Sequence, residues 1–389
     1  MPPQRFNGRE TNRFKVLRAL YTHPGSTRTK LAEYTGLSRP TVSSVADELV
    51  QAGLVEQHED PQPRTGRPPV LLSLVPGAGF AVGLDMGHAH VQVAVSDLAG
   101  EILGRQRSTA DVDHDPLGSF DLAHELIKGA LKQAGVTRER VIGVGMALAA
   151  PVNRATGVVF AEGILPNWGG LQPATEMQAR LGLPVQVHND ANLGALGEHV
   201  FGAGSEVADM LYVRLSAGIG LGLVLDGHPY GGAGGIAGEL GHVRAEPDGL
   251  ICRCGNRGCL ETVASSHAVA RLLARSREEP VTVERLLELV ASDDRGAKRA
   301  VAEAGRAVGE ALATVVNLFN PELIIVGGDL AATGETVLAP LRAAIEQFAI
   351  APAANAVKVS AGALGDRAEV LGGVALILGE SPAILAASR

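Results

Sequence analysis

Three short segments near the start of the chain repeat their hydrophobic residues at the spacing of an α-helix. The second segment ends at Gly36, which suits the sharp turn of a helix-turn-helix. The third follows Ser38, a favourable N-cap residue, and has Pro40 in its first turn. The residues expected to face inward are Phe14, Leu17, Leu20 and Tyr21 in the first segment, Leu31 and Ala32 in the second, and Val42, Val45 and Leu49 in the third.

The polar face of the third predicted helix carries side chains that fit the major groove of DNA without a clash. The stretch PQPRTGRPPVLLSL predicts a two-stranded wing with a basic, proline-stiffened tip that suits a narrow minor groove. Residues 1–72 are therefore predicted to form a winged helix-turn-helix domain that binds DNA. The alternative is a small helical interaction domain with a merely solvated polar face. The predicted DNA contacts are Arg39, Thr41, Ser43, Ser44, Arg64 and Arg67.

From about residue 78 onward, the patterns of strands and helices alternate. GFAVGLDMGHAHVQVAVSDLAG predicts two strands of a meander that end in a turn at Leu98–Gly100. A helix is predicted near Leu122–Gln133, followed by the apolar strand VIGVGMAL. Further strands are expected in LPVQVHNDAN, MLYVRLSAGIGLGLVLDG and NPELIIVGGDL. This alternation predicts α/β layers over residues 78–389.

Composition and charge narrow the class of protein. The chain of 389 residues is 46% hydrophobic and 20% charged, which is typical of a globular protein with ample core. Residues 1–75 hold ten Lys/Arg and seven Asp/Glu, so a head of charge +3 precedes a body of charge −11 within the total of −8. A basic head favours an anionic partner. We recognise no signal peptide and no membrane-spanning run, and the few cysteines indicate a reduced, cytoplasmic protein with no membrane partner.

Glycine turns follow three of the predicted strands. Backbone N–H groups in such turns can cradle phosphates if the turns converge, although glycine also simply makes turns. Asp85 and Asp190 stand at strand ends and are candidate site residues, with turn capping as the alternative. The candidate phosphate-loop residues are Asp85, Gly87, Gly218, Gly220, Gly327 and Gly328.

All three cysteines lie in ICRCGNRGCLET, residues 251–262. An odd number of thiols leaves no closed set of disulfides within one chain, and two cysteines one residue apart bridge only with strain. Three thiolates on a tight loop suit tetrahedral zinc, which takes a fourth ligand that is most often histidine. The candidate zinc ligands are Cys252, Cys254 and Cys259, with His242, ten residues before Cys252, as a candidate for the fourth.

Several motifs together resemble one known family over essentially the entire chain. They are GLDMG, APVNRATGVV, VHNDANLGALGEH, LSAGIGLGLVLDG, GELGHV and CRCGNRGCLET. The chain resembles the ROK family of repressors, open reading frames and kinases, and its head resembles that of the repressor branch. The resemblance implies an actin-like, two-lobed, sugar-kinase-like ATPase fold for the body, with a structural zinc beside a sugar pocket. The residues that it implies for sugar binding are Asn189, Asp190, Glu239, His242 and Glu261.

The chain departs from the kinase pattern of this family in both phosphate loops. The kinase loop D-x-G-G-T-K is replaced by DMGHAH, so His88 stands at the second glycine and Ala89 at the threonine. The loop G-T-G-I-G-G-G is replaced by SAGIGLG. Losing such contacts would slow phosphoryl transfer by on the order of 10²–10⁴-fold. DVDHD, at 111–115, is interpreted as a solvated loop.

We therefore expect a sugar-responsive transcriptional regulator that represses carbohydrate-utilisation genes. Sugar entry would change lobe closure and shift two winged helices across a homodimer or homotetramer on a palindromic operator. The alternative is an ATP–Mg²⁺-dependent hexose or amino-sugar kinase in which Asp190 is the catalytic base. A DNA-binding scaffold with an inactive body is the third hypothesis, and the complete set of implied sugar residues speaks against it.

Overall fold

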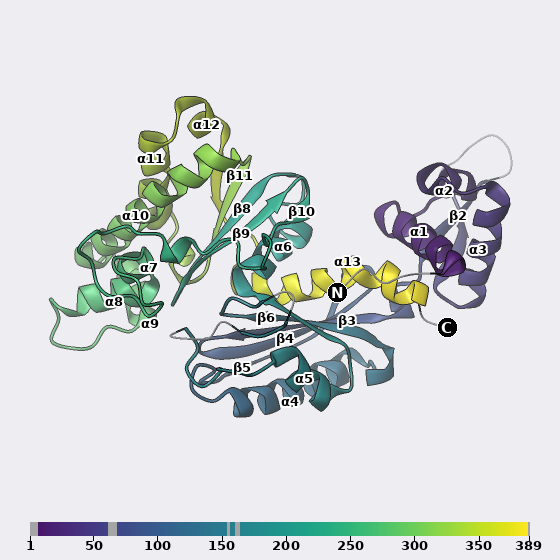
Figure 1. The fold of residues 1–389 in the computed structure, drawn as a ribbon, viewed down its shortest axis with the longest axis horizontal. Coiled ribbons are helices and arrows are strands. Elements are labelled where there is room, and N and C mark those ends of the chain that lie inside the picture. Colours follow the sequence, from purple (N-terminus) through teal and green to yellow (C-terminus); the bar gives the residue numbers. More distant parts are fainter. Residues whose placement is uncertain (1–6, 61–67, 154–155, 160–163, 388–389) are drawn as a thin grey trace.

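A computed structural model describes residues 7–60, 68–153, 156–159 and 164–387. It shows a small head attached to a body of two lobes (Figure 1). Each lobe contains a five-stranded sheet, and two helices run between the sheets.

The head consists of three helices and a two-stranded antiparallel wing, as the sequence predicts. Asn7, Thr27 and Ser38 cap the three helices with side-chain oxygens, and Gly36 ends the second with a left-handed φ of 67°. The predicted inward stripe of the third helix is buried. The bounds are α1 Gly8–Thr22, α2 Arg28–Thr35, α3 Arg39–Gln51, β1 Val55–Glu59 and β2 Val70–Leu74.

The first lobe is a mixed sheet in the order β5-β4-β3-β6-β7. The predicted meander is confirmed, because β3, β4 and β5 are antiparallel neighbours, whereas β6 and β7 run parallel to β3. The helix predicted near Leu122–Gln133 begins earlier, because Asp115 caps it and a proline fills its first position. The bounds are β3 Phe80–Gly87, β4 His90–Asp97, β5 Ile102–Thr109, α4 Pro116–Ala134, β6 Val141–Leu148, α5 Pro173–Leu181 and β7 Val185–Asn189.

The second lobe repeats this plan with the sheet order β10-β9-β8-β11-β12. Its strands are β8 Met210–Leu215, β9 Ile219–Leu225, β10 His228–Pro229, β11 Leu323–Gly327 and β12 Lys358–Ala361. Six helices pack on it: α7 Glu261–Ala264, α8 Ser266–Ala274, α9 Val283–Ala291, α10 Arg295–Phe319, α11 Glu335–Phe348 and α12 Ala351–Ala356.

Helices α6, Asp190–Phe201, and α13, Ala368–Ala387, lie together between the two sheets (Figure 1). The contact between them is close because α13 carries glycines here: a Cβ on Gly372 would stand 1.8 Å from the carbonyl oxygen of Leu193. The far end of α13 contacts α1 of the head, and the Arg13 guanidinium donates a hydrogen bond of 3.3 Å to the carbonyl of Leu385. One helix thus links the space between the lobes to the head.

The segment Gly365–Ala387 is also long and apolar enough to cross a membrane by length and composition. Two thirds of that window are buried inside the protein, against α6 and the strands β3 and β6. Its apolar character is accounted for by this packing, so the segment is not convincing as a membrane span.

Candidate functional site

A buried chain of charged groups lies between the lobes, where β7 ends and α6 begins. Asn189 caps α6 by accepting hydrogen bonds from two backbone N–H groups, and Asp190, the first residue of the helix, is 6% exposed. One oxygen of Asp190 accepts from the N–H of Ala191 at 2.8 Å, and the other lies 3.3 Å from Arg214 Nη1. The helix N-terminus and the guanidinium together favour a carboxylate at this position.

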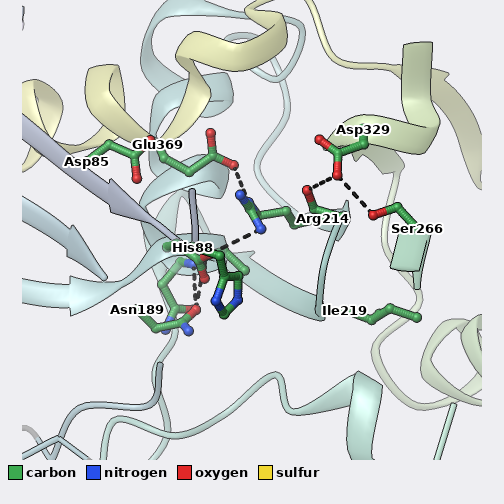
Figure 2. Close-up of polar contacts among 12 residues, drawn as sticks. Asp85, His88, Asn189, Arg214, Ile219, Ser266, Asp329 and Glu369 are labelled. Atoms are coloured by element: carbon green, nitrogen blue, oxygen red, sulfur yellow. Dashed lines mark hydrogen bonds and ion pairs between the residues drawn. The ribbon is translucent and has the colours of Figure 1, made fainter. Parts of the chain in front are cut away.

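Arg214 connects Asp190 to Glu369, which lies at the start of α13. Its Nε donates to Glu369 Oε1 at 3.0 Å (Figure 2). The Tyr212 hydroxyl donates to the same oxygen at 3.0 Å. Burial, together with the charges of Asp85 and Asp190, raises the pKa of Glu369 to about 7 against the effect of Arg214. Although burial lowers it, the pKa of Arg214 is raised above its usual range by the surrounding carboxylates. Glu369 is therefore the carboxyl group that holds a proton near neutral pH, and Arg214 stays charged.

The implied sugar residues line one small cavity beside this chain. Its volume is about 40 Å³, room for roughly three water molecules. Burial and the nearby Asp190 and Glu261 raise the pKa of Glu239 to about 7. Asn189, Asp190, Glu239, His242 and Glu261 all contribute to the lining.

Arg253 lines this cavity and bridges the two lobes. Its Nε donates to Glu261 Oε1 at 2.9 Å, and its Nη1 donates to the carbonyl of Ile164, in the first lobe, at 3.4 Å. The other oxygen of Glu261 accepts from the N–H of Ile219 at 3.2 Å. A ligand larger than a few waters must displace this bridge or move the lobes apart.

The histidine and cysteines predicted as metal ligands form one cluster. Ligand atoms of His242, Cys252, Cys254 and Cys259 all lie within 4.8 Å of one another, an arrangement that could hold a metal ion. The Cys254 and Cys259 sulfurs are 3.7 Å apart, and all three cysteines are free thiols. His242 also lines the small cavity, so the cluster anchors one of its walls.

Two of the predicted phosphate loops, at 88–90 and at Gly327–Gly328, border a second, larger cleft of about 900 Å³. The predicted residues Gly218 and Gly220 line the small cavity instead. His90 Nε2 lies 2.8 Å from Asp85 Oδ2, and the ring of His90 fills the open side of Gly87, where an added Cβ would meet it at 2.5 Å. Next to Gly327 and Gly328, the Asp329 carboxylate accepts hydrogen bonds from two serine hydroxyls, at 2.5 and 3.0 Å (Figure 2). These are Ser216 and Ser266, and Ser216 opens the loop that contains Gly218 and Gly220. The side chains of His90 and Asp329 thus lie beside Gly87 and Gly328, where a phosphate would have to approach the backbone.

In the head, the predicted base-reading residues stand on α3. Arg39 and Ser44 are exposed and Thr41 and Ser43 are half-buried. The Thr41 hydroxyl is within 2.8 Å of the Ser38 hydroxyl, which fixes it at the helix N-terminus. Arg64 and Arg67 lie outside the described residues.

Sequence reasoning missed three polar residues of the site: Arg214, Arg253 and Glu369. Arg214 is the only charged residue in the apolar strand MLYVRL, and this was the available signal. Likewise, Glu369 lies among apolar residues in α13. Asp113 in the loop interpreted as solvated was also missed, since it pairs with His88 at 2.7 Å. No local spacing indicates these pairs.

A winged helix joined to a two-lobed body of the sugar-kinase type defines a class of transcriptional regulators. Sequence profiles agree: that of the ROK family matches residues 81–380, and that of the MarR family matches residues 8–64. The chain belongs to the ROK family. It is 30% identical over 387 residues to the xylose repressor of Caldicellulosiruptor bescii, and the match covers 96% of each chain.

Solved structures of relatives have the same fold. A ROK family transcriptional regulator, a homologue of the E. coli MLC protein, superposes with a TM-score of 0.82 at 26% identity, covering 97% of this chain and 98% of that one. A ROK family glucokinase from Streptomyces griseus, in complex with glucose and AMPPNP, gives a TM-score of 0.69 at 30% identity over 77% of this chain and 99% of the other. The predicted fold, an actin-like body behind a winged helix, is confirmed.

Proposed function

We propose that the protein is a sugar-responsive DNA-binding transcriptional regulator that represses carbohydrate-utilisation genes. The observation that carries the proposal is α13, which begins at the charged chain of the cleft and ends against the head. Residues 1–72 act as the DNA-binding unit and residues 78–389 as the sugar sensor. The relatives that match both parts are repressors and a transcriptional regulator by name, and they support this assignment.

In this proposal α3 reads the operator. Arg39 and Ser44 project from the exposed face of α3, and Thr41 and Ser43 complete its polar surface. Arg64 and Arg67, which lie between the two wing strands in the sequence, add contacts in the minor groove. The operator is palindromic because the protein acts as a homodimer or homotetramer in the cytoplasm. Self-association is supported by a groove of about 980 Å³ beside α8 and α10, whose lining includes the exposed Leu250 (56%) and Leu318 (72%).

The sugar binds in the small cavity. Asn189, Asp190 and Glu239 offer amide and carboxylate groups that suit neighbouring hydroxyls, and His242 and Glu261 complete the set. A xylose repressor and a glucose-bound glucokinase are among the similar proteins, and they support an aldose as effector. The cavity is too small for a monosaccharide, so binding displaces Arg253 and changes the angle between the lobes.

The metal is zinc in this proposal, and the four ligands fit it. With Zn–S bonds of ~2.3 Å, a tetrahedral ion places its sulfurs ~3.8 Å apart. The distance from Cys254 Sγ to Cys259 Sγ is 3.7 Å, and that from Cys252 Sγ to His242 Nδ1 is also 3.7 Å. Four protein ligands leave no open position, so the metal is structural and holds the loop that carries Arg253 and Glu261.

The alternative function, an ATP–Mg²⁺-dependent sugar kinase, has Asp190 in its favour as a candidate base. Against it stand the side chains that fill the phosphate loops. His90 covers Gly87, and the carboxylate of Asp329 lies beside Gly328, where it would repel a nucleotide phosphate. We therefore propose that Asp190 accepts a hydrogen bond from a sugar hydroxyl and does not abstract its proton.

The test combines ligand binding with operator release. Ligand binding is measured by thermal shift with a library of aldoses, each with and without ATP–Mg²⁺. A ligand at a hundred times its Kd adds about 2.7 kcal/mol to the free energy of unfolding. We expect a shift with one sugar, none with ATP–Mg²⁺, and release of an operator fragment by the same sugar in fluorescence anisotropy. Sugar phosphorylation at roughly 1–100 s⁻¹ would establish the kinase instead.

A further inference from the structure

His88 stands at the junction between the small cavity and the larger cleft. Among the described residues, only His88 and Arg214 line both spaces. Arg214 is already held by Asp190 and Glu369. In Figure 2, the ring projects toward the centre of the cleft, near Asn189 and Arg214.

The orientation of this ring is fixed by Asp113. Nδ1 of His88 lies 2.7 Å from Asp113 Oδ1, with exposed side-chain fractions of 12% and 24%. The N–H of Val112 donates to the carbonyl of His88 at 3.3 Å, and the Trp168 indole donates to the carbonyl of Val112 at 2.7 Å. The segment that carries Asp113 is therefore tied to His88 and to the core, and it holds the imidazole in one orientation.

This pairing also determines which ring nitrogen is left for a ligand. A carboxylate only accepts, so Nδ1 carries the proton, and Nε2 of the neutral ring is an acceptor. Among the described residues Nε2 has no hydrogen-bond partner. A sugar hydroxyl in the cavity is a suitable donor to it.

We propose that His88 is a sugar-contacting, specificity-determining residue, which accepts a hydrogen bond from the cleft-facing hydroxyl and leaves no room for a phosphate there. The effector class is accordingly an unphosphorylated monosaccharide. This inference rests on the proposed function, because it concerns the ligand of the same cavity.

The experiment measures the affinities of D-xylose, D-glucose and glucose 6-phosphate by calorimetry for the wild type and four variants of the full chain. His88→Gly removes the ring, His88→Asn shortens the side chain, and Asp113→Ala removes the acceptor that orients the ring. His114→Asn is the matched control, since His114 belongs to the same loop but is 65% exposed and paired with Asp111. Operator binding of each variant checks that it is folded.

We expect the wild type to bind an unphosphorylated sugar and to reject the phosphate ester. His88→Gly should bind that sugar roughly three- to ten-fold more weakly and discriminate less against the ester, with the other two site variants in between and His114→Asn unchanged. Equal affinity and equal discrimination in wild type and His88→Gly would overturn this inference alone. A wild type that binds operator but no sugar would overturn the proposed function, and this inference with it.

Discussion

The buried charged side chains between the lobes lead to a specific prediction about Glu369. Glu369→Gln keeps an oxygen that can accept from both Tyr212 and Arg214, and it removes only the titratable proton. The pKa of Glu369 is raised from 4.5 to about 7 in the folded protein. The folded state therefore holds a proton that the unfolded state has lost between these two pH values. Stability from this group is present at low pH and falls as pH rises through that window.

The magnitude follows from the two pKa values. Between pH 5 and pH 8 the wild type should lose roughly 2.5 kcal/mol of unfolding free energy that the Glu369→Gln variant cannot lose. Titrating groups that do not interact with Glu369, the thiols of the metal cluster included, contribute equally to both proteins and cancel in the difference.

The assay is urea unfolding at a series of pH values, followed by far-UV circular dichroism and by the fluorescence of Trp168, the single tryptophan, which is fully buried. Coincident transitions from both probes are required before free energies are compared. Glu380→Gln is the matched control, because it removes a carboxyl group from the same helix far from Arg214. Parallel pH profiles for the wild type and Glu369→Gln would refute the reasoning.

Three further predictions concern the metal, operator binding, and the coupling between the sugar site and the head. Cys254→Ser should lower the zinc content and the melting temperature, and unchanged zinc by mass spectrometry would remove this residue from the ligand set. Arg39→Ala should weaken operator binding by roughly 1–3 kcal/mol in anisotropy without changing the fold, and an equal loss on unrelated DNA would mean that Arg39 contacts phosphate instead. Arg13→Ala breaks the hydrogen bond to Leu385 and should leave sugar and operator binding intact while weakening their coupling, so full sugar-induced release would contradict the role of α13.

Much of the head and of the metal cluster could be predicted because the signals are local. Ser38 and Gly36 mark helix ends through backbone geometry that a few residues determine, and the structure has both as predicted. The predicted metal ligands Cys252, Cys254 and Cys259 fall within eight residues of one another, so spacing alone limits how they can be arranged. Strand patterns and motifs likewise placed Asp190 at the end of a strand, where the structure begins α6.

The sequence by itself therefore determined the elements of the head, several strands of the body and the residues of the metal cluster, and the motifs shared with a known family indicated the fold class. Only the tertiary structure decided that Arg214 pairs with Glu369, 155 positions away, and that Arg253 bridges to a carbonyl 89 positions away. It also placed the end of α13 against the head, about 24 Å along the helix from Glu369. Such pairs have no period and no fixed spacing, because they form when separate elements pack. The electrostatics and the coupling of this site depend on those contacts.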